Sequence, residues 1–507
     1  MNISVTDDLR WLKIEECTQQ EYSVLRCAYN KPVQGYKFMP LYKKGLWDGH
    51  MNFLKGQYIP YGSIGYLKNI CAQSGFELNL SGIDKIIYSV SFEDFSQWCY
   101  DFFETSELKP RDYQIESAWK IVHNRFSLSE LATSAGKTLI TFIALAYLLK
   151  HNLVSKVLMV VPTTELVLQS SEDFKKYNEK CNGKLDLNIS MIYEGKHLEE
   201  EANITVGTFQ SLVKWENSEL RQIDCVVVDE THKAKCKSIQ TILSKCDNAK
   251  FKFGLTGTMP DIKYSDYLTI ASHIGPLITS IKAAELQERG YISKCHILQI
   301  YLNYLEEENK SGLSKAMKHV KSIKGPQAAF NLEKEVIISN PKRFGFIISM
   351  MELAHKNTLV LFHRRKYGKI LYQQLKDRCP GKIIMFIDGN VATESRDSIL
   401  KTMQENQNVI LIASYATVGT GISVERIENI VFAESFKSPH IILQAVGRGL
   451  RLKEKLGLPN KVTIIDLVDD FRIKSPSFTN YMYLHGNERK KLYKEASYPF
   501  EIKKIKI

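Results

Sequence analysis

The sequence has 507 residues, of which 44% are hydrophobic, and a formal net charge of +12. This is enough apolar material for several globular domains, and the basic balance favours a polyanionic partner. The longest apolar run, Leu139 to Leu149, is too short to span a bilayer, and Asp7 and Asp8 do not fit a secretory signal. The ten cysteines include no C-x-x-C pair, so they indicate neither a zinc ribbon nor a disulfide framework. We therefore expect a cytoplasmic protein that does not bind membranes.

Residues 1–100 are expected to form a separate small α/β domain. Thr18-Gln-Gln-Glu21 is typical of a capping box that opens a helix, and the stretch from Gly35 to Gly65 predicts strands and turns. Aromatic and basic residues alternate in Tyr36-Lys-Phe38, Tyr42-Lys-Lys44 and Trp47-Asp-Gly49. Such residues can contact a nucleic-acid backbone and stack on bases, or the aromatic rings can form a small core.

Residues 105–285 alternate strand and helix patterns, which is typical of a doubly wound parallel sheet. Leu131-Ala-Thr-Ser-Ala-Gly-Lys-Thr138 stands before the apolar helical segment, although the full phosphate-loop pattern has glycine where Leu131 stands. A Gly-Lys-Thr at this point predicts that backbone N–H groups face a phosphate, that Lys137 reaches the β- and γ-phosphates of ATP, and that Thr138 holds magnesium. The candidate ATP-binding residues of this loop are Thr133, Ser134, Ala135, Gly136, Lys137 and Thr138.

Val157–Val161 and Cys225–Val228 are typical of buried strands. The second leads into Asp229-Glu-Thr-His232, at the carboxyl edge where α/β sheets bind ligands. Phosphoryl transfer needs a carboxylate near Mg²⁺ and a group that orients the attacking water. Asp229 and Glu230 are therefore candidate catalytic residues, and Asp229 with Thr138 is the candidate ligand set for Mg²⁺.

Residues 286–340 are expected to be a charged helical linker. Glu306-Glu-Glu308 is followed by lysines at every third position, which favours a solvated helix face rather than a core. These lysines are Lys315, Lys318, Lys321 and Lys324.

Residues 341–470 predict a second α/β sheet without its own Gly-Lys-Thr. Its buried-strand candidates are Leu359–Phe362, Ile383–Phe386, Val409–Ile412, Ile430–Phe432 and Val462–Ile465. The segment Gln444-Ala-Val-Gly-Arg-Gly-Leu-Arg451 follows the fourth. Arg448 and Arg451 are three residues apart, so on a helix they would share a face; they act either as fingers toward a γ-phosphate or as partners in surface salt bridges.

Residues 471–507 form a basic C-terminal extension. From Arg472 to Ile507 there are nine Lys or Arg and three Glu, a net charge of +6, which is half of the formal total. Tyrosines punctuate the stretch, and the pattern indicates a helical cap that either packs on the second domain or lies along a phosphate backbone.

The motifs in this order resemble the superfamily 2 DExH helicases over residues 110–452. Pro40 to Gly49, the Thr-Ser-Ala-Gly-Lys loop and the basic tail further resemble the UvsW helicase family of T-even-type bacteriophages, over nearly the whole chain. The resemblance implies two RecA-like domains in tandem, a small N-terminal α/β domain, a C-terminal extension and ATP-driven unwinding. Ser134 departs from the family by replacing the usual first glycine of the loop, and Thr163-Thr-Glu-Leu166 lacks the usual arginine.

The resemblance also assigns roles to individual residues. It implies that Gln114 reads the adenine, that Gly421 contacts the nucleotide, and that Gln444 joins Arg448 and Arg451 as a catalytic group. The implied strand contacts are Thr208, Gln210, His363, Gly389, Ser414 and Thr417. The residues implied to couple the two sites are His232, Thr256 and Thr258.

The same resemblance implies a substrate class: branched DNA such as forks, Holliday junctions and D-loops, and the RNA–DNA hybrids of R-loops, in recombination, replication and repair. We expect a monomer in the host cytoplasm, with recombination or single-strand-binding proteins as further partners. Three alternatives stay open. The chain could be a double-strand translocase or annealing and branch-migration factor that separates few base pairs, a catalytically inactive nucleic-acid-binding scaffold, or the motor of a restriction system.

Overall fold

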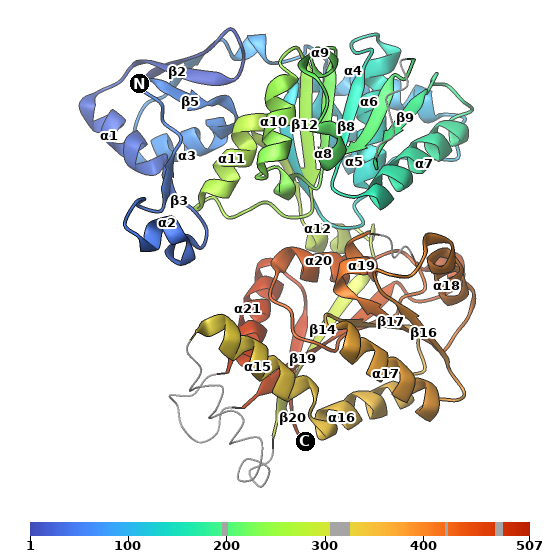
Figure 1. The fold of residues 1–507 in the computed structure, drawn as a ribbon. Coiled ribbons are helices and arrows are strands. Elements are labelled where there is room, and N and C mark those ends of the chain that lie inside the picture. The colour runs from blue at the N-terminus through green and yellow to red at the C-terminus, as the bar shows by residue number, and fades with distance from the viewer. Residues whose placement is uncertain (195–200, 305–324, 421–423, 472–479) are drawn as a thin grey trace. The chain divides into compact units, whose positions relative to one another are not determined.

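The computed structural model describes residues 1–194, 201–304, 325–420, 424–471 and 480–507 (Figure 1). The chain divides into two compact units. The first comprises Met1–Ala132 and Gly136–Ile281, and the second comprises Thr133–Ala135 and Lys282–Ile507. Gly421, the four spaced lysines after Glu308 and that Glu triplet itself lie outside the described residues.

The N-terminal part of the first unit contains a four-stranded sheet of order β5-β2-β1-β6. Its strands are β1 (Asn2–Val5), β2 (Trp11–Glu16), β5 (Tyr58–Pro60) and β6 (Asn79–Ser81), accompanied by helices α1 (Gln19–Ala28) and α3 (Ile64–Ser74). The predicted capping box at α1 is confirmed: Glu21 N donates to Thr18 Oγ1 at 3.2 Å and Thr18 N donates to Glu21 Oε2 at 2.7 Å. This local closure explains why α1 begins where the sequence indicates.

A two-stranded ladder of β3 (Asn30–Pro32) and β4 (His50–Asn52) extends from this part. The chain between the two strands forms the short helices η1 (Tyr36–Phe38) and α2 (Pro40–Lys43). The aromatic residues of this region divide as follows: Phe53 is buried in the core, Trp47 is half-buried and Tyr58 is exposed. The small-core interpretation therefore holds for Phe53 but not for Tyr58.

The larger sheet of the first unit has seven parallel strands of order β13-β7-β12-β11-β8-β10-β9. They are β7 (Phe126–Leu131), β8 (Val157–Val161), β9 (Ile189–Ile192), β10 (Ile204–Thr208), β11 (Cys225–Asp229), β12 (Phe251–Thr256) and β13 (Leu277–Ile281). The further helices of this unit are α4 (Phe92–Phe103), α5 (Asp112–Asn124), α6 (Lys137–Lys150), α7 (Thr164–Lys180), α8 (Phe209–Leu212), α9 (Asn217–Leu220), α10 (Lys237–Lys245) and α11 (Ser265–Ile274). The expected parallel α/β domain is confirmed.

The second unit contains another sheet of seven parallel strands, of order β16-β17-β15-β18-β19-β14-β20. They are β14 (Lys294–Asn303), β15 (Thr358–Phe362), β16 (Ile383–Ile387), β17 (Val409–Ser414), β18 (Asn429–Phe432), β19 (Lys461–Asp470) and β20 (Phe500–Lys506). Its helices are α12 (Ala283–Glu288), α15 (Pro326–Ile338), α16 (Pro341–Glu352), α17 (Arg365–Arg378), α18 (Thr393–Glu405), α19 (Tyr415–Thr420), α20 (Pro439–Arg448) and α21 (Tyr481–Glu495). The fold class is thus two RecA-like sheets in tandem, as the sequence predicts.

Two strands of the second sheet come from regions for which the sequence analysis expected no strand. β14 lies within the range assigned to a charged helical linker, and β20 lies within the basic extension. β14 pairs with β19 over ten residue pairs and with β20 on its other side. The extension is therefore part of the sheet and not a separate appendage.

A buried ion pair fixes the extension to the sheet. Arg489 of α21 and Asp466 of β19 are 1% and 0% exposed, and their Nη2 and Oδ1 atoms lie 2.7 Å apart. Tyr493 Oη and Gln299 Nε2 each donate to Asp466 Oδ2 at 3.0 Å. Since every oxygen of this carboxylate has partners, the buried charge is compensated. Of the two interpretations of the extension, packing on the second domain holds for this face of α21.

A second buried pair joins α16 to the same strand. Arg343 Nε donates to Asp469 Oδ1 at 2.7 Å, and both side chains are 1% exposed. Tyr304 Oη donates to the same oxygen at 2.6 Å. β19 therefore carries two carboxylates that are both paired with arginines from helices of its own unit.

Within the part of the chain that the structure describes, no helix combines the length and apolar character needed to cross a membrane.

We predict that Arg489→Ala destabilises the second unit by about 3–5 kcal/mol, because it leaves Asp466 as an uncompensated buried charge. Lys491→Ala, on the exposed face of the same helix, should change stability by less than about 0.5 kcal/mol. Urea denaturation with hydrogen exchange read on β14 and β19 measures both. Equal protection of these strands in the two variants would contradict the anchoring role of the ion pair.

Candidate nucleotide and nucleic-acid sites

The loop between β7 and α6 contains two residues with left-handed backbone conformation, separated by one residue. Gly136, the residue before α6, has φ +81°, and Ser134 has φ +71°. The left-handed region is costly for residues with a Cβ atom, so Ser134 is strained where the helicase family usually has glycine. Lys137 and Thr138 begin α6 and are half-buried. The helix N-terminus and the backbone amides of such a loop suit a phosphate group.

Gln114 lies beside this loop. Its side chain is 6% exposed, and its Oε1 accepts a hydrogen bond from Arg111 N at 2.9 Å at the start of α5. A Cβ atom added to Gly136 would stand 2.4 Å from Gln114 Nε2. The structure therefore brings the predicted adenine-reading residue and the predicted phosphate loop together, and it leaves no room for a side chain between them.

Asp229 and Glu230 lie at the end of β11. Burial and the neighbouring charge of Glu230 raise the pKa of Asp229 to about 6, while the charge of Lys137 opposes this rise. Glu230 N donates to Asp229 Oδ1 at 2.8 Å, and Glu230 has φ +51°, which is strained for a residue with a side chain. The acid pair thus stands close to the lysine of the phosphate loop.

The donor set near Lys137 fits magnesium. Thr138 offers a hydroxyl and Asp229 a carboxylate, and Mg²⁺ prefers oxygen ligands. A divalent cation would also relieve the repulsion between two adjacent carboxyls that raises the pKa of Asp229. The assignment of these two residues as ligands stays a prediction.

The three residues predicted to couple the sites lie together where the neighbouring strands β11 and β12 end. His232 Nδ1 is 3.3 Å from Thr256 Oγ1, and Thr256 Oγ1 donates to the carbonyl of Thr258 at 3.1 Å. His232 Nδ1 also lies 3.4 Å from Glu230 Oε2. A polar chain therefore runs from the acid pair to the loop after β12.

Sequence reasoning missed Glu130, on β7. Met259 N donates to Glu130 Oε1 at 3.0 Å, and Ser280 Oγ donates to Glu130 Oε2 at 2.8 Å. Glu130 therefore holds the start of the segment that follows Thr258. The sequence analysis predicted no strand for Ser127-Leu-Ser-Glu-Leu131, so nothing in the sequence marked this carboxylate as part of a sheet.

The strand contacts predicted for the first unit lie where β10 ends. Thr208 is 5% exposed, and its Oγ1 donates to Ser211 Oγ at 3.1 Å, while Gln210 is exposed. Thr208 therefore orders the turn that leaves Gln210 exposed, and the contact of Gln210 with a nucleic-acid strand stays a prediction.

The strand contacts predicted for the second unit lie after three adjacent strands, in the order β16, β17 and β15. Gly389 and His363 are exposed, Ser414 is half-buried, and Thr417 is 3% exposed with its Oγ1 donating to the Ser414 carbonyl at 2.7 Å. Because parallel strands end at one edge, these residues share that edge. Burial makes Thr417 a residue that orders the turn.

Glu434 was also missed and holds the backbone at His363. Its Oε2 accepts from His363 N at 2.7 Å and from Arg364 N at 2.8 Å, and its Oε1 lies 2.6 Å from Lys334 Nζ. Burial alone would raise the pKa of Glu434, but Lys334 and the two amide donors lower it below the usual value. Glu434 is therefore a charged, buried anchor for this edge.

The predicted arginine fingers do not lie on one helix. Gln444 and Arg448 are four residues apart on α20, but α20 ends at Arg448 and Arg451 follows it. Ser293 fixes this segment, since its N donates to the Leu450 carbonyl at 2.7 Å and its Oγ donates to the Arg451 carbonyl at 2.5 Å. The expectation that Arg448 and Arg451 share a helix face is wrong, because Gly449 and Leu450 leave the helix.

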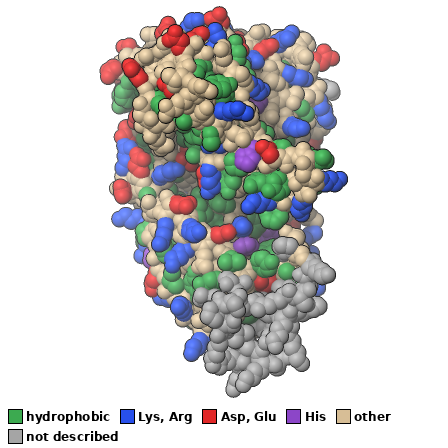
Figure 2. All heavy atoms as spheres, turned by 90° about the vertical axis from the view of Figure 1, so that its left-hand side faces the viewer, with side chains coloured by type: hydrophobic (Ala, Val, Ile, Leu, Met, Phe, Trp, Pro, Cys, Tyr) green, Lys and Arg blue, Asp and Glu red, His purple; other side chains and the backbone are tan. Residues whose placement is uncertain are grey.

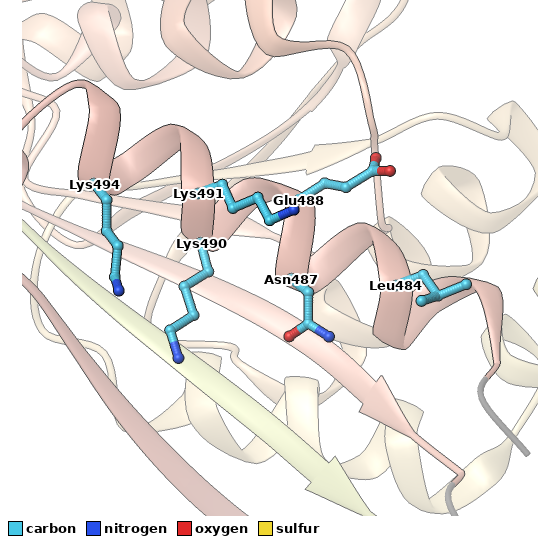
Figure 3. Close-up of a pocket in the computed structure, with 6 residues that line it drawn as sticks. All are labelled: Leu484, Asn487, Glu488, Lys490, Lys491 and Lys494. Carbon is cyan, nitrogen blue, oxygen red and sulfur yellow. The ribbon is translucent and has the colours of Figure 1, made fainter. Parts of the chain in front are cut away.

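The solvent side of α21 is basic. Lys490, Lys491 and Lys494 line a shallow pocket of ≈ 570 Å³ with Leu484, Asn487 and Glu488. Figure 3 shows Lys490, Lys494 and Asn487 pointing to the same side of the helix, above the strands. This face, opposite the buried Arg489, has the charge that suits phosphate groups, as do the exposed lysines of β20.

Three family models match the chain. "DNA helicase UvsW, N-terminal" matches residues 3–81, "Type III restriction enzyme, res subunit" matches residues 107–261, and "Helicase conserved C-terminal domain" matches residues 342–453. The chain is 28% identical over 508 residues to the ATP-dependent DNA helicase uvsW of Enterobacteria phage T4, covering 97% of each chain.

Solved structures resemble the fold. The ATP-dependent Type ISP restriction-modification enzyme LlaBIII bound to DNA gives a TM-score of 0.57 at 15% identity, over 86% of this chain and 34% of that one. S. cerevisiae Dbp5 bound to RNA and ADP BeF3 gives a TM-score of 0.51 at 14% identity, over 78% of this chain and 90% of that one. At these identities the likeness concerns the fold alone.

We predict that Gly136→Ala weakens ATP binding at least about tenfold, because the new methyl group meets Gln114 and the left-handed backbone costs about 1–2 kcal/mol. Gly65→Ala, on α3, is the control, since nothing lies within 4 Å of its added Cβ. Titration with a fluorescent ATP analogue measures both variants. Unchanged affinity in Gly136→Ala would remove the loop from the nucleotide site.

Proposed function

The chain belongs to the superfamily 2 helicases and is an ATP-dependent DNA helicase, and from this premise we propose that it acts on branched DNA and on RNA–DNA hybrids. The proposed substrates are forks, Holliday junctions, D-loops and R-loops, and the proposed roles lie in recombination, replication and repair. One observation carries the proposal: the similarity to the phage T4 helicase extends through residues 3–81, outside the motor.

We propose the following roles for these residues in ATP hydrolysis. Lys137 binds the β- and γ-phosphates, and Glu230 orients the attacking water. Magnesium, when bound, would be held by Thr138 and Asp229 and would neutralise phosphate charge. Arg448 and Arg451 of the second unit stabilise the charge that develops on the γ-phosphate. Removal of that phosphate releases the arginines, which couples hydrolysis to motion.

Strand tracking is proposed for the carboxyl edges of both sheets. Gln210 contacts the backbone of one strand from the first unit, and His363, Gly389 and Ser414 contact it from the second. These contacts go to phosphate and sugar, so little sequence preference is expected. His232 and Thr256 connect the strand contacts of the first unit to the acid pair.

We predict that Lys137→Ala lowers DNA-stimulated ATP hydrolysis by at least about a hundredfold, because the charge that meets the phosphates is lost. Binding to a four-way junction should survive. Lys150→Ala, an exposed lysine at the other end of α6, should hydrolyse ATP at the wild-type rate. Equal turnover by Lys137→Ala and the control would remove the site assignment.

We predict that the triple variant Lys490→Ala, Lys491→Ala, Lys494→Ala weakens DNA binding and reduces the slope of log K against log salt by up to about 2.7, or 0.9 for each lost phosphate contact. Three exposed lysines of α6 and α7, Lys150, Lys175 and Lys180, form the matched control set. An unchanged slope would assign the exposed face of α21 to solvation. Point changes are preferable to deletion, since deletion from residue 472 removes β20 and Arg489.

The substrate class is tested by comparing ATP turnover and strand separation on single strands, linear duplex, forks, four-way junctions and RNA–DNA hybrids. We expect unwinding of the branched molecules and of the hybrid. Turnover with movement along duplex but without strand separation would favour the alternative, a translocase or annealing and branch-migration factor.

A further inference from the structure

Residues 34–46, here called the tip, carry an unusual group of exposed apolar side chains. Phe38 is 74% exposed, Leu46 is 72% exposed and Leu41 is 56% exposed. These are three of the five most exposed large hydrophobic residues in the described part of the chain, and they lie within nine residues. Scattered exposed leucines need no explanation, but a cluster of this kind indicates a contact surface.

The tip is held in a defined shape. The β3–β4 ladder closes its base, with Val33 N donating to the Gly49 carbonyl at 2.9 Å. The rings of Tyr36 and Tyr42 meet edge to face at 4.8 Å, and an added Cβ on Gly49 would stand 2.1 Å from the Tyr36 ring. The tyrosines therefore pack inward against each other and the backbone, while the apolar cluster faces solvent on a fixed support.

The charge of the tip has one sign. Lys37, Lys43 and Lys44 are exposed, and no Asp or Glu occurs between residues 34 and 46. Figure 2 looks onto the side of the molecule where α2 lies in Figure 1, and there green hydrophobic and blue basic side chains lie next to one another. A partner for this surface must offer apolar area surrounded by negative charge.

We propose that the tip contacts the branch point of DNA, with Phe38, Leu41 and Leu46 against the terminal base pair and the three lysines against the flanking phosphates. This rests on the proposed function, because only a branched or ended duplex exposes the flat apolar face of a base pair. Apolar side chains are known to serve as wedges between or against base steps, and lysines supply phosphate contacts.

Other partners fit the tip less well. An amphipathic membrane helix needs a continuous apolar face, and α2 has only four residues. A stable protein interface buries about 800 Å² on each partner, whereas the tip is a segment of 13 residues with four exposed large hydrophobic side chains, Phe38, Met39, Leu41 and Leu46. A contact with the terminal base pair and its flanking phosphates uses both the exposed apolar side chains and the lysines of the tip.

The test is the double variant Phe38→Ala, Leu46→Ala in the full chain. Tyr100→Ala and Leu353→Ala, which remove apolar side chains that are 63% and 76% exposed elsewhere, are the matched controls. We expect the double variant to unwind forks at least tenfold more slowly, with unchanged ATP turnover on single strands. A 2-aminopurine base at the branch point should change its fluorescence on binding the wild type and not on binding the variant.

Fork unwinding and 2-aminopurine response at wild-type levels in the double variant would overturn the proposal. Loss of binding to phosphatidylserine vesicles, with fork unwinding intact, would assign the tip to membranes and also overturn it. Failure of the proposed function would give a different result, because the wild type itself would then unwind forks and linear DNA at equal rates.

The double variant Lys43→Ala, Lys44→Ala should weaken fork binding and reduce the slope of log K against log salt by about 1.8. An unchanged slope would contradict the phosphate contacts.

Discussion

Parallel strands end at one edge of a sheet, and this constraint assembles the candidate sites from residues that are far apart in the sequence. In the first unit, β7, β12, β11, β8 and β10 are neighbours in that order. The phosphate loop, the Thr256 turn, the acid pair and the Thr208 turn follow four of these strands. In the second unit, β16, β17 and β15 bring together Gly389, Ser414 and His363 in the same way. Gln114 of α5 and Arg448 of α20 are the candidate residues that come from helices instead.

Three carboxylates in the two units show how environment separates structural from chemical roles. Asp466 and Asp469 each meet an arginine and further donors, so their charge is compensated within the fold. Asp229 instead faces a second carboxyl, and burial raises its pKa to about 6 against the effect of Lys137. A carboxylate kept in such a place favours an added cation, which is what a magnesium ligand requires. The contrast supports the assignment of Asp229 to chemistry rather than to packing.

Most of the predicted inner strands agree with the structure, because strands buried on both faces are continuous apolar runs, whereas the inner strand β7, which alternates serine with leucine, was not predicted. Val157–Val161 coincides with β8, and the other predicted strands agree within one to five residues. β20 was not predicted because the sequence of an edge strand with lysines on its surface resembles that of a solvated tail. β14 was not predicted because it lies beside a charged run. Glu130 and Glu434 act through partners that are distant in sequence, so only the fold reveals them.

The motor edges described above contact only phosphate and sugar in our proposal, and such contacts are nearly the same on every DNA strand. On this proposal, any discrimination between branched and linear molecules comes from outside these strand edges. The N-terminal region is where the family match is specific to UvsW, whereas the two motor regions match general helicase and restriction-enzyme models. Within that region, the tip combines exposed apolar side chains with unopposed positive charge on a rigid support. Substrate choice and ATP chemistry would then reside in separate parts of one chain, so that either can change without loss of the other.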